Sequence, residues 1–273
     1  MSKVTFLEPP AVSGRTPERY AGCSYELYHF PDLGNLYPMT CLDRIGVETA
    51  YVDSTMEKLD QAAFLARIAA DDSDFYVIHA VVLAKPTDLF YTAEILKRRP
   101  GAKLLLHGPE ATRVPQEYLT DPRVIVFRGE VEKPLVTYLQ TGRLSGASLL
   151  EDGAVRHIPQ EDAGYEMDEL PIPRRDHPSL KPTMFDFQNP KFNEGPFTTA
   201  LASRGCPFRC KFCVPISISF ARELEEGTNG KTTRVKKASA KRVIEEAEYL
   251  KGLGYRSIHF TDDQFLWEKP RTM

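Results

Sequence analysis

The sequence has little of what a secreted, membrane-spanning or nucleic-acid-binding protein needs. Five cysteines among 273 residues, three of them clustered, do not make a disulfide framework, which favours the reduced cytoplasm as the location. No apolar run approaches the roughly 20 residues of a membrane span, and residues 1–8 lack a signal-peptide pattern. A formal net charge of −3 gives no reason to expect a nucleic acid or an anionic membrane as partner.

The clustered cysteines are the most informative feature of the chain. Cys206, Cys210 and Cys213 form a C-x3-C-x2-C pattern directly after an apolar, β-prone run at 197–202. Soft thiolates select iron–sulfur clusters, zinc or Cu(I). A structural zinc site has four protein ligands. After Cys213 the sequence has no second cysteine pair, and His259 is the only later histidine, so zinc is disfavoured. Three thiolates on a cubane leave one iron free. A zinc knuckle or three reduced bystander thiols stay open as alternatives.

Residues 204–213, Arg-Gly-Cys-Pro-Phe-Arg-Cys-Lys-Phe-Cys, resemble the cluster loop of radical S-adenosylmethionine (SAM) enzymes. The resemblance implies that Cys206, Cys210 and Cys213 hold a 4Fe–4S cluster and that SAM chelates the fourth iron. It places Phe212 near the adenine of SAM. It further implies an external electron donor such as flavodoxin or ferredoxin, and a 5′-deoxyadenosyl radical that abstracts hydrogen from an unactivated carbon of a small-molecule substrate.

The first 141 residues alternate short apolar runs with helical stretches. Apolar runs without strict alternation are typical of strands that are buried on both faces. Strands separated by helices of this length predict βαβ units and an α/β fold with a doubly wound parallel sheet of the Rossmann or flavodoxin kind. The expected strands are 4–7, 48–52, 75–82, 103–106 and 124–127, and the expected helices are 36–45, 58–70, 88–99 and 132–139.

Loops at the carboxyl ends of such strands are where a doubly wound sheet binds ligands. Residues 108–112 read Gly-Pro-Glu-Ala-Thr, residues 128–132 read Arg-Gly-Glu-Val-Glu, and a helix near 31–42 contains Leu33-Gly34. Together these segments resemble the cobalamin-binding-type domains that are fused to radical SAM barrels. The resemblance implies cobalamin contacts, and the candidate residues are Pro9, Gly108, Glu110, Gly129 and Glu130.

No Asp-x-His-x-x-Gly motif, which would supply an imidazole to cobalt, is present. The chain resembles members that bind cobalamin with no protein histidine on the metal, and a domain that keeps the fold without cobalamin stays an alternative. His79, inside an apolar strand, is expected to be a satisfied core residue. His107 adjoins a ligand-side loop and is not assigned as a ligand.

Residues 142–195 are interrupted by glycine and proline, which excludes long helices and predicts an ordered, extended connector. Gly153 is expected in a small hairpin turn. The Leu-Pro-Ile-Pro run at 170–173 resembles the segment that links the two domains in the same family. The expected organisation is therefore a cobalamin-binding-type domain at 1–141, a connector at 142–195 and a radical SAM part at 196–273.

The last segment predicts the first units of a β/α barrel. Ser239 is expected to cap a helix over 240–251, with Glu245, Glu246 and Lys251 on its solvated side. The next strand, 256–260, delivers Asp262 and Asp263 at its carboxyl end, where β/α barrels place their chemistry. The resemblance implies that this pair contacts the methionyl end of SAM. A turn or a helix cap is an equal alternative.

A complete barrel of this type normally needs about 200 residues, so we expect only a partial barrel here, from a fragment or truncated product. Three functions remain in competition. The first is a cobalamin-dependent radical SAM methyltransferase or rearrangement enzyme acting on a lipid, tetrapyrrole or natural product. The second is a radical SAM enzyme whose first domain has lost cobalamin. The third is a non-catalytic iron–sulfur or corrinoid-binding fragment.

Overall fold

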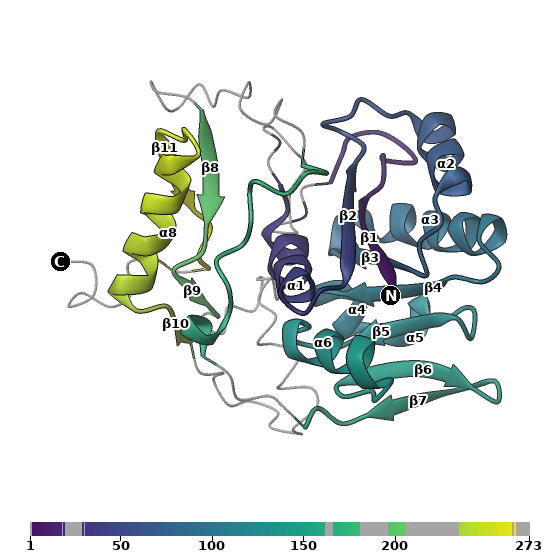
Figure 1. The fold of residues 1–273 in the computed structure, drawn as a ribbon. Coiled ribbons are helices and arrows are strands. Elements are labelled where there is room, and N and C mark those ends of the chain that lie inside the picture. Colours follow the sequence, from purple (N-terminus) through teal and green to yellow (C-terminus); the bar gives the residue numbers. More distant parts are fainter. Residues whose placement is uncertain are drawn as a thin grey trace.

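The computed structural model describes residues 2–17, 19, 29, 31–161, 166–180, 196–205, 235–263 and 265. Its largest element is a seven-stranded sheet of order β2-β1-β3-β4-β5-β6-β7 (Figure 1). Strands β1 to β5 run parallel, and β6 and β7 continue the sheet as an antiparallel hairpin. The strands are β1 Lys3–Glu8, β2 Glu48–Asp53, β3 Phe75–His79, β4 Lys103–His107, β5 Val124–Phe127, β6 Ala147–Glu151 and β7 Ala154–Ile158.

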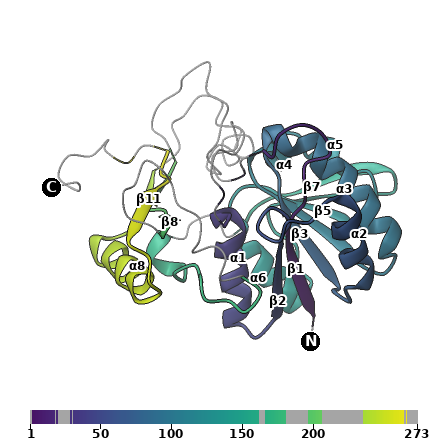
Figure 2. The ribbon, with the colours of Figure 1, turned by 90° about the horizontal axis from the view of Figure 1, so that it is seen from above.

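Helices cover both faces of this sheet, as the doubly wound prediction requires (Figure 2). Helices α1 and α6 pack on one face, where Phe6, Val77 and Leu105 are buried. On the opposite face, α2 and α3 cover the alternate residues of the same strands, among them Leu7 and Ile78. The helices are α1 Leu33–Arg44, α2 Gln61–Ala70, α3 Lys85–Arg98, α4 Pro109–Arg113, α5 Pro115–Tyr118 and α6 Glu132–Thr141, with a 3-10 turn Val82–Ala84 before α3.

The five predicted parallel strands are confirmed, each to within a few residues of its expected bounds. Helix α1 begins at Leu33, three residues before its prediction, because the Asp32 side chain caps it by accepting from the Gly34 amide at 2.8 Å. Strand β3 ends at His79, since the chain turns into the 3-10 helix soon after. None of the helices described here is long and apolar enough to cross a membrane.

The expected hairpin at Gly153 forms, and Asp152 and Gly153 both have positive φ angles, 50° and 78°. Two such residues make the type of turn whose twist matches that of the flanking strands. Strand β6 pairs with β5, so residues of the predicted connector extend the first sheet beyond residue 141. Beyond them, 166–180 holds a 3-10 helix at Met167–Glu169.

The last described segments form one βαβ unit beside the first sheet (Figure 1). Strands β8 Phe197–Ala200 and β11 Ser257–Phe260 are parallel neighbours, with helix α8 Ala240–Gly252 between them in sequence. A short antiparallel pair, β9 Ser203–Arg204 and β10 Lys236–Lys237, adjoins them. Ser239 caps α8 as predicted, its hydroxyl accepting from the Arg242 amide at 3.2 Å.

The prediction that Glu246 lies on the solvated side of α8 is wrong. Glu246 is 3% exposed, and it faces the same way as Arg242 and Leu250, four residues before and after it. Its carboxylate lies 3.6 Å from the guanidinium of Arg175. Burial raises the pKa of Glu246, and the charges of Arg175 and Arg242 oppose that rise. The 166–180 segment therefore supplies a buried partner that helical periodicity could not indicate.

Gly108 is the position where this fold most clearly excludes a side chain. Its φ is +100°, and an added Cβ would lie 2.4 Å from the His79 ring and 2.8 Å from the Ala80 carbonyl oxygen. We expect Gly108→Ala to lower the free energy of unfolding by about 3 kcal/mol, through backbone strain and steric overlap. Chemical denaturation checks this. Gly101→Ala is the control, because nothing lies within 4 Å of that Cβ position, and equal losses in the two variants would contradict the assignment.

Candidate functional site

The carboxyl edge of the first sheet carries a row of ionisable residues. Asp53, Glu8, His79 and His107 are the last residues of the neighbouring strands β2, β1, β3 and β4, and we call these four the carboxyl-edge row. Every member is at least 95% buried. Side chains alternate between sheet faces, and the register pairs Glu8 with Asp53 and His79 with His107. The four side chains therefore point to the face that α1 covers.

Asp32 joins this row to the start of α1. Its carboxylate caps the helix through the Gly34 amide and also contacts His79, whose Nδ1 lies 2.6 Å from Asp32 Oδ2. Burial raises the pKa of Asp32, but the hydrogen bonds and charges of its neighbours, His79 first and then the Gly34 amide, together outweigh burial, so the pKa lies below its ordinary value. His79 is thus a satisfied buried residue, as predicted. Its ring occupies the space where Gly34 and Gly108 have no side chain.

His107 stacks on His79, with ring centroids 4.9 Å apart and planes 11° from parallel. Its Nε2 lies 3.2 Å from Asn35 Oδ1. His107 Nδ1 and Asn35 Nδ2 are buried without a hydrogen-bond partner within the described part of the chain. Buried polar atoms are normally satisfied by protein, water or a ligand. This pair therefore identifies a place in the row suited to a polar group.

The residues predicted to contact cobalamin follow β1, β4 and β5. Pro9 is buried just after β1. Glu110 is 1% exposed, and Arg113 donates to both its oxygens at 2.8 and 2.6 Å. The Gly129 amide donates to Thr112 Oγ1 at 3.1 Å. These contacts fix the two glycine-containing loops against each other at the carboxyl edge, and their contact with cobalamin stays a prediction.

Glu130 and its neighbour Glu132 receive two cations from the 196–263 part of the chain. Arg204 Nη2 donates to Glu132 Oε1 at 2.6 Å, and Arg204 Nη1 lies 3.8 Å from Glu130. Lys236 Nζ donates to the Glu130 carboxylate. We call Glu130, Glu132, Arg204 and Lys236 the Arg204 cluster. All four are at least 92% buried, so the cluster is an ion-pair network inside the protein rather than on its surface.

The Arg204 cluster brings like charges together as well as opposite ones. Arg204 and Lys236 face each other across the β9–β10 pair, an arrangement that is unfavourable without acidic partners. Burial raises the pKa of Glu130, and the charges of Arg204 and Lys236 act against that rise. The guanidinium of Arg204 also lies 4.6 Å from the centre of the Tyr37 ring on α1, a cation–π distance.

Asp262 and Asp263 hold the backbone that leads into the cysteine loop. Asp262 Oδ2 accepts from the Ala202 amide at 3.0 Å, and the Ser203 hydroxyl donates to its other oxygen. Asp263 Oδ2 accepts from the Gly205 amide at 3.1 Å. Both carboxylates therefore act on residues directly before Cys206. Contact with SAM stays a prediction, as do the roles of Phe212, Cys206, Cys210 and Cys213, which lie outside the described residues.

The sequence reasoning missed Arg204, Lys236 and Glu132 as partners. In the sequence, Glu132 belongs to the 128–132 motif and begins an expected helix, and Arg204 belongs to the cysteine motif. The only signal in the sequence is that charged residues lie beside strand-like segments. Arg204 is 72 positions from Glu132 and Lys236 is 106 positions from Glu130, so the sequence does not indicate which charges pair. Only the folded chain brings them together.

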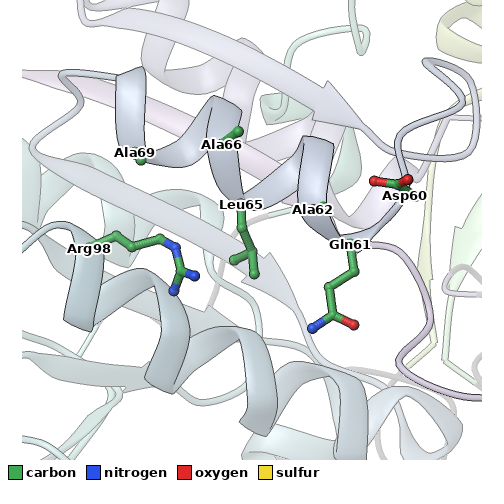
Figure 3. Close-up of a pocket in the computed structure, with 7 residues that line it drawn as sticks. All are labelled: Asp60, Gln61, Ala62, Leu65, Ala66, Ala69 and Arg98. Atoms are coloured by element: carbon green, nitrogen blue, oxygen red, sulfur yellow. The ribbon is translucent and has the colours of Figure 1, made fainter.

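A surface groove lies between α2 and α3, the helices that cover the sheet face opposite α1 (Figure 3). Its volume is about 720 Å³. Small side chains on α2 leave the space, and Arg98 of α3 reaches across one end, as Figure 3 shows. No histidine or cysteine lines this groove; its lining residues are Asp60, Gln61, Ala62, Leu65, Ala66, Ala69 and Arg98. It offers no group for the chemistry that the cysteine motif indicates.

Comparison with known proteins gives relatives in sequence, although no family model matches the chain. The uncharacterized methyltransferase PH0819 of Pyrococcus horikoshii is 30% identical over 254 residues, which cover 89% of this chain and 51% of that protein. The uncharacterized methyltransferase sll1242 of Synechocystis sp. is 28% identical over 172 residues, 62% of this chain and 26% of that protein. The chain thus spans about half, or less, of the length of these relatives.

Two solved structures share the fold. One is the cobalamin-dependent SAM radical enzyme OxsB with aqua-cobalamin and SAM bound, with a TM-score of 0.67, 17% identity, and coverage of 99% of this chain and 35% of that one. The other is the radical SAM methyltransferase TsrM from Kitasatospora setae with tryptophan and a SAM analogue bound, with a TM-score of 0.67, 18% identity and coverage of 99% and 49%. At these identities the likeness establishes the fold.

The Arg204 cluster predicts a large effect from removing one charge. Glu132→Ala leaves the buried Arg204 guanidinium without its 2.6 Å acceptor, and we expect a loss of about 3–5 kcal/mol in unfolding free energy. Urea denaturation measures it. The matched control is Glu245→Ala, which removes an exposed pair with Lys241 on α8 and is expected to change stability by less than about 1 kcal/mol. A loss below that limit in Glu132→Ala would contradict the buried pairing.

The buried His107 predicts a pH dependence of stability. Burial, followed by the charge of His79, lowers its pKa to about 3 from the ordinary value of 6.5. Neutral His107 therefore makes its full contribution to the free energy of unfolding above pH 6.5. This contribution is lost as the pH falls from 6.5 toward 3, because the unfolded chain takes up a proton that the folded chain does not. Between pH 8 and pH 5 we expect the unaltered chain to lose about 2 kcal/mol more than His107→Asn. Unfolding midpoints at both pH values measure this difference, and parallel losses in the two proteins would refute it.

Proposed function

We propose that this chain is part of a cobalamin-dependent radical SAM enzyme, with methylation of an unactivated carbon as its reaction. Three findings support the proposal. The cysteine motif resembles the cluster loop of that family, the fold is that of OxsB and TsrM, and two sequence relatives carry the name methyltransferase. The substrate classes that we propose are a lipid, a tetrapyrrole or a natural product.

The observation that carries the proposal is the anchoring of the chain just before Cys206. Asp262 and Asp263 bind the backbone of residues 202–205 from one side, and Glu132, at the start of α6, binds the Arg204 side chain. A metal site works only where its ligands are held in place by surrounding hydrogen bonds. This segment thus enters the cysteine loop with a fixed backbone, beside the sheet edge where doubly wound folds bind ligands.

Cys206, Cys210 and Cys213 would hold the cluster, because three thiolates at this spacing suit a cubane with one open iron. When bound, the cluster, SAM and cobalamin together supply radical formation and methyl transfer. The chain's own part is to bind and orient these groups and to keep water from them. An electron donor such as flavodoxin or ferredoxin completes the proposed set of partners, and we propose a cytoplasmic setting.

The carboxyl edge fits a large polar ligand in two respects. Gly129, with a φ angle of 76°, presents backbone without a side chain in the loop after β5, while the space beside Gly108 is filled by the His79 ring. His107 Nδ1 and Asn35 Nδ2 are buried polar atoms in need of a partner. Pro9, Glu110 and Glu130 adjoin the same edge. These features support cobalamin as the ligand of this edge, with no protein imidazole assigned to its cobalt.

A second candidate keeps the cluster chemistry without cobalamin. The Gly129 amide is already bonded to Thr112, and Glu130 already binds Lys236, so both predicted contacts serve the protein itself. In this reading the first domain docks and braces the cysteine loop. Titration with hydroxocobalamin, followed by desalting and visible absorbance, separates the two candidates. Retention of one corrinoid per chain favours the first, and complete loss favours the second.

Loss of the cluster ligand Cys210 tests the shared part of both candidates. After anaerobic reconstitution, we expect Cys210→Ala to lose the brown colour and most of the bound iron, because two thiolates do not hold a cubane. Iron and sulfide analysis with visible absorbance measures this. Cys41→Ala is the matched control, since Cys41 is half-buried on α1 and burial raises its pKa to about 12, which keeps it a thiol. A full cluster in Cys210→Ala would refute the assignment.

A further inference from the structure

Three buried side chains that the proposed function does not use converge at one end of the carboxyl-edge row. They are Glu8, His29 and Asp53, and one ligand atom from each lies within 4.8 Å of the others. Each residue is at least 94% buried. They come from three separate segments, the end of β1, the end of β2 and residue 29 between them. A histidine with two carboxylates is a donor set for first-row divalent metals.

The sheet itself places the two carboxylates together. Glu8 and Asp53 are register partners on the parallel strands β1 and β2, so their side chains leave the sheet on the same face. His29 meets them from that face, and its Nε2 lies 2.6 Å from Asp53 Oδ2. The convergence is therefore built on two rigid strands, which hold ligands more firmly than surface loops do.

Neighbouring groups fix the direction of each carboxylate. Asp53 Oδ1 accepts from the Met56 amide at 3.0 Å, which turns Oδ2 toward His29. The Tyr51 hydroxyl donates to Glu8 Oε1, and the Asp32 amide lies 3.3 Å from the same oxygen. Such outer hydrogen bonds are the usual means of orienting metal ligands. The donors from Tyr51 and Asp32 are both neutral groups.

The electrostatic environment also favours a cation. Two further buried carboxylates, Asp32 and Asp88, lie at this edge, and Asp88 Oδ2 has no hydrogen-bond partner among the described residues. The nearby Arg19 donates to Asp88 at 2.7 Å. The charges of Asp88, Glu8 and Asp32 raise the pKa of Arg19 against the effect of burial, which shows that these carboxylates act on one small region. Asp32 and Asp88 have hydrogen-bond partners of their own in His79 and Arg19, so the carboxylates that a bound cation would stabilise are Glu8 and Asp53.

We propose that Glu8, His29 and Asp53 form a site for one divalent first-row transition metal ion, with Zn²⁺ and Mn²⁺ as the test ions. In the metal-free protein, His29 Nε2 and Asp53 Oδ2 are joined by a hydrogen bond of 2.6 Å. The ion takes the place of this hydrogen bond: the neutral imidazole keeps its one proton on Nδ1, and His29 Nε2 and Asp53 Oδ2 move apart to metal–ligand distances of about 2.0–2.2 Å. Three protein ligands leave a coordination position open for water or a ligand.

The first measurement uses the full chain with Cys206, Cys210 and Cys213 replaced by alanine, so that thiolates do not compete for metal. Its fold is first matched to that of the unaltered chain by far-UV circular dichroism and unfolding temperature. We expect one Zn²⁺ or Mn²⁺ per chain after desalting, and a higher unfolding temperature with metal than without. Less than a fifth of an equivalent for both ions would overturn the proposal, whether or not the iron–sulfur and cobalamin chemistry is correct.

Variants in the same background locate the ion. We expect His29→Gln and Asp53→Asn each to weaken metal binding at least about tenfold in calorimetric titration. His157→Gln, which changes a histidine on β7 far along the sheet, should bind as the parent does. If one of these variants fails to fold, Glu8→Gln replaces it, and the same tenfold weakening in calorimetric titration is expected. Unchanged affinity in every folded ligand variant would show that the ion binds elsewhere and that the assignment is wrong.

Discussion

The bond between Arg204 and Glu132 is the constraint on which the arrangement of this protein depends. It joins the strand that leads into the cysteine loop to the first turn of α6, at a distance of 2.6 Å in a buried setting. A buried charge is costly unless it is paired, so this bond stabilises both groups in their buried positions. Lys236, on the neighbouring strand, forms a second buried ion pair with Glu130. Glu130 and Glu132 follow Gly129, whose amide donates to the Thr112 hydroxyl oxygen. The segment before Cys206 and the loop after β5 at the carboxyl edge therefore fix each other's positions.

The carboxyl edge of the first sheet has a polar interior. Most of the sheet is apolar on both faces, yet its strands end in Asp53, Glu8, His79 and His107, all buried under α1. The two glycines at 34 and 108 allow this, because their missing side chains make room for the His79 ring. Buried ionisable groups add little to the free energy of unfolding, so stability alone does not account for them. Their concentration at the edge where doubly wound sheets bind ligands makes this edge the candidate functional site.

The second part of the chain depends on the same kind of contact. Arg242 donates to the carbonyl oxygens of Leu170 and Pro171, and Arg175 donates to the carbonyl oxygen of Thr199. The 166–180 segment is thus held to the βαβ unit through arginine side chains. It has little regular secondary structure of its own, so these bonds satisfy backbone carbonyls that no helix or strand satisfies. A proline-rich segment becomes an ordered spacer by this means.

The sequence by itself determined the parallel strands, the helices between them, the hairpin at Gly153 and the cap at Ser239. These follow from local rules of periodicity, capping and turn geometry that act within a few residues. It also pointed to Cys206, Cys210 and Cys213 through spacing alone. Only the tertiary structure decided that Glu246 faces inward, that Asp262 and Asp263 hold residues 202–205, and that Arg204 meets Glu132. These choices depend on charges far apart in the chain, and the free energy of a buried charge is set by the partner that folding brings to it.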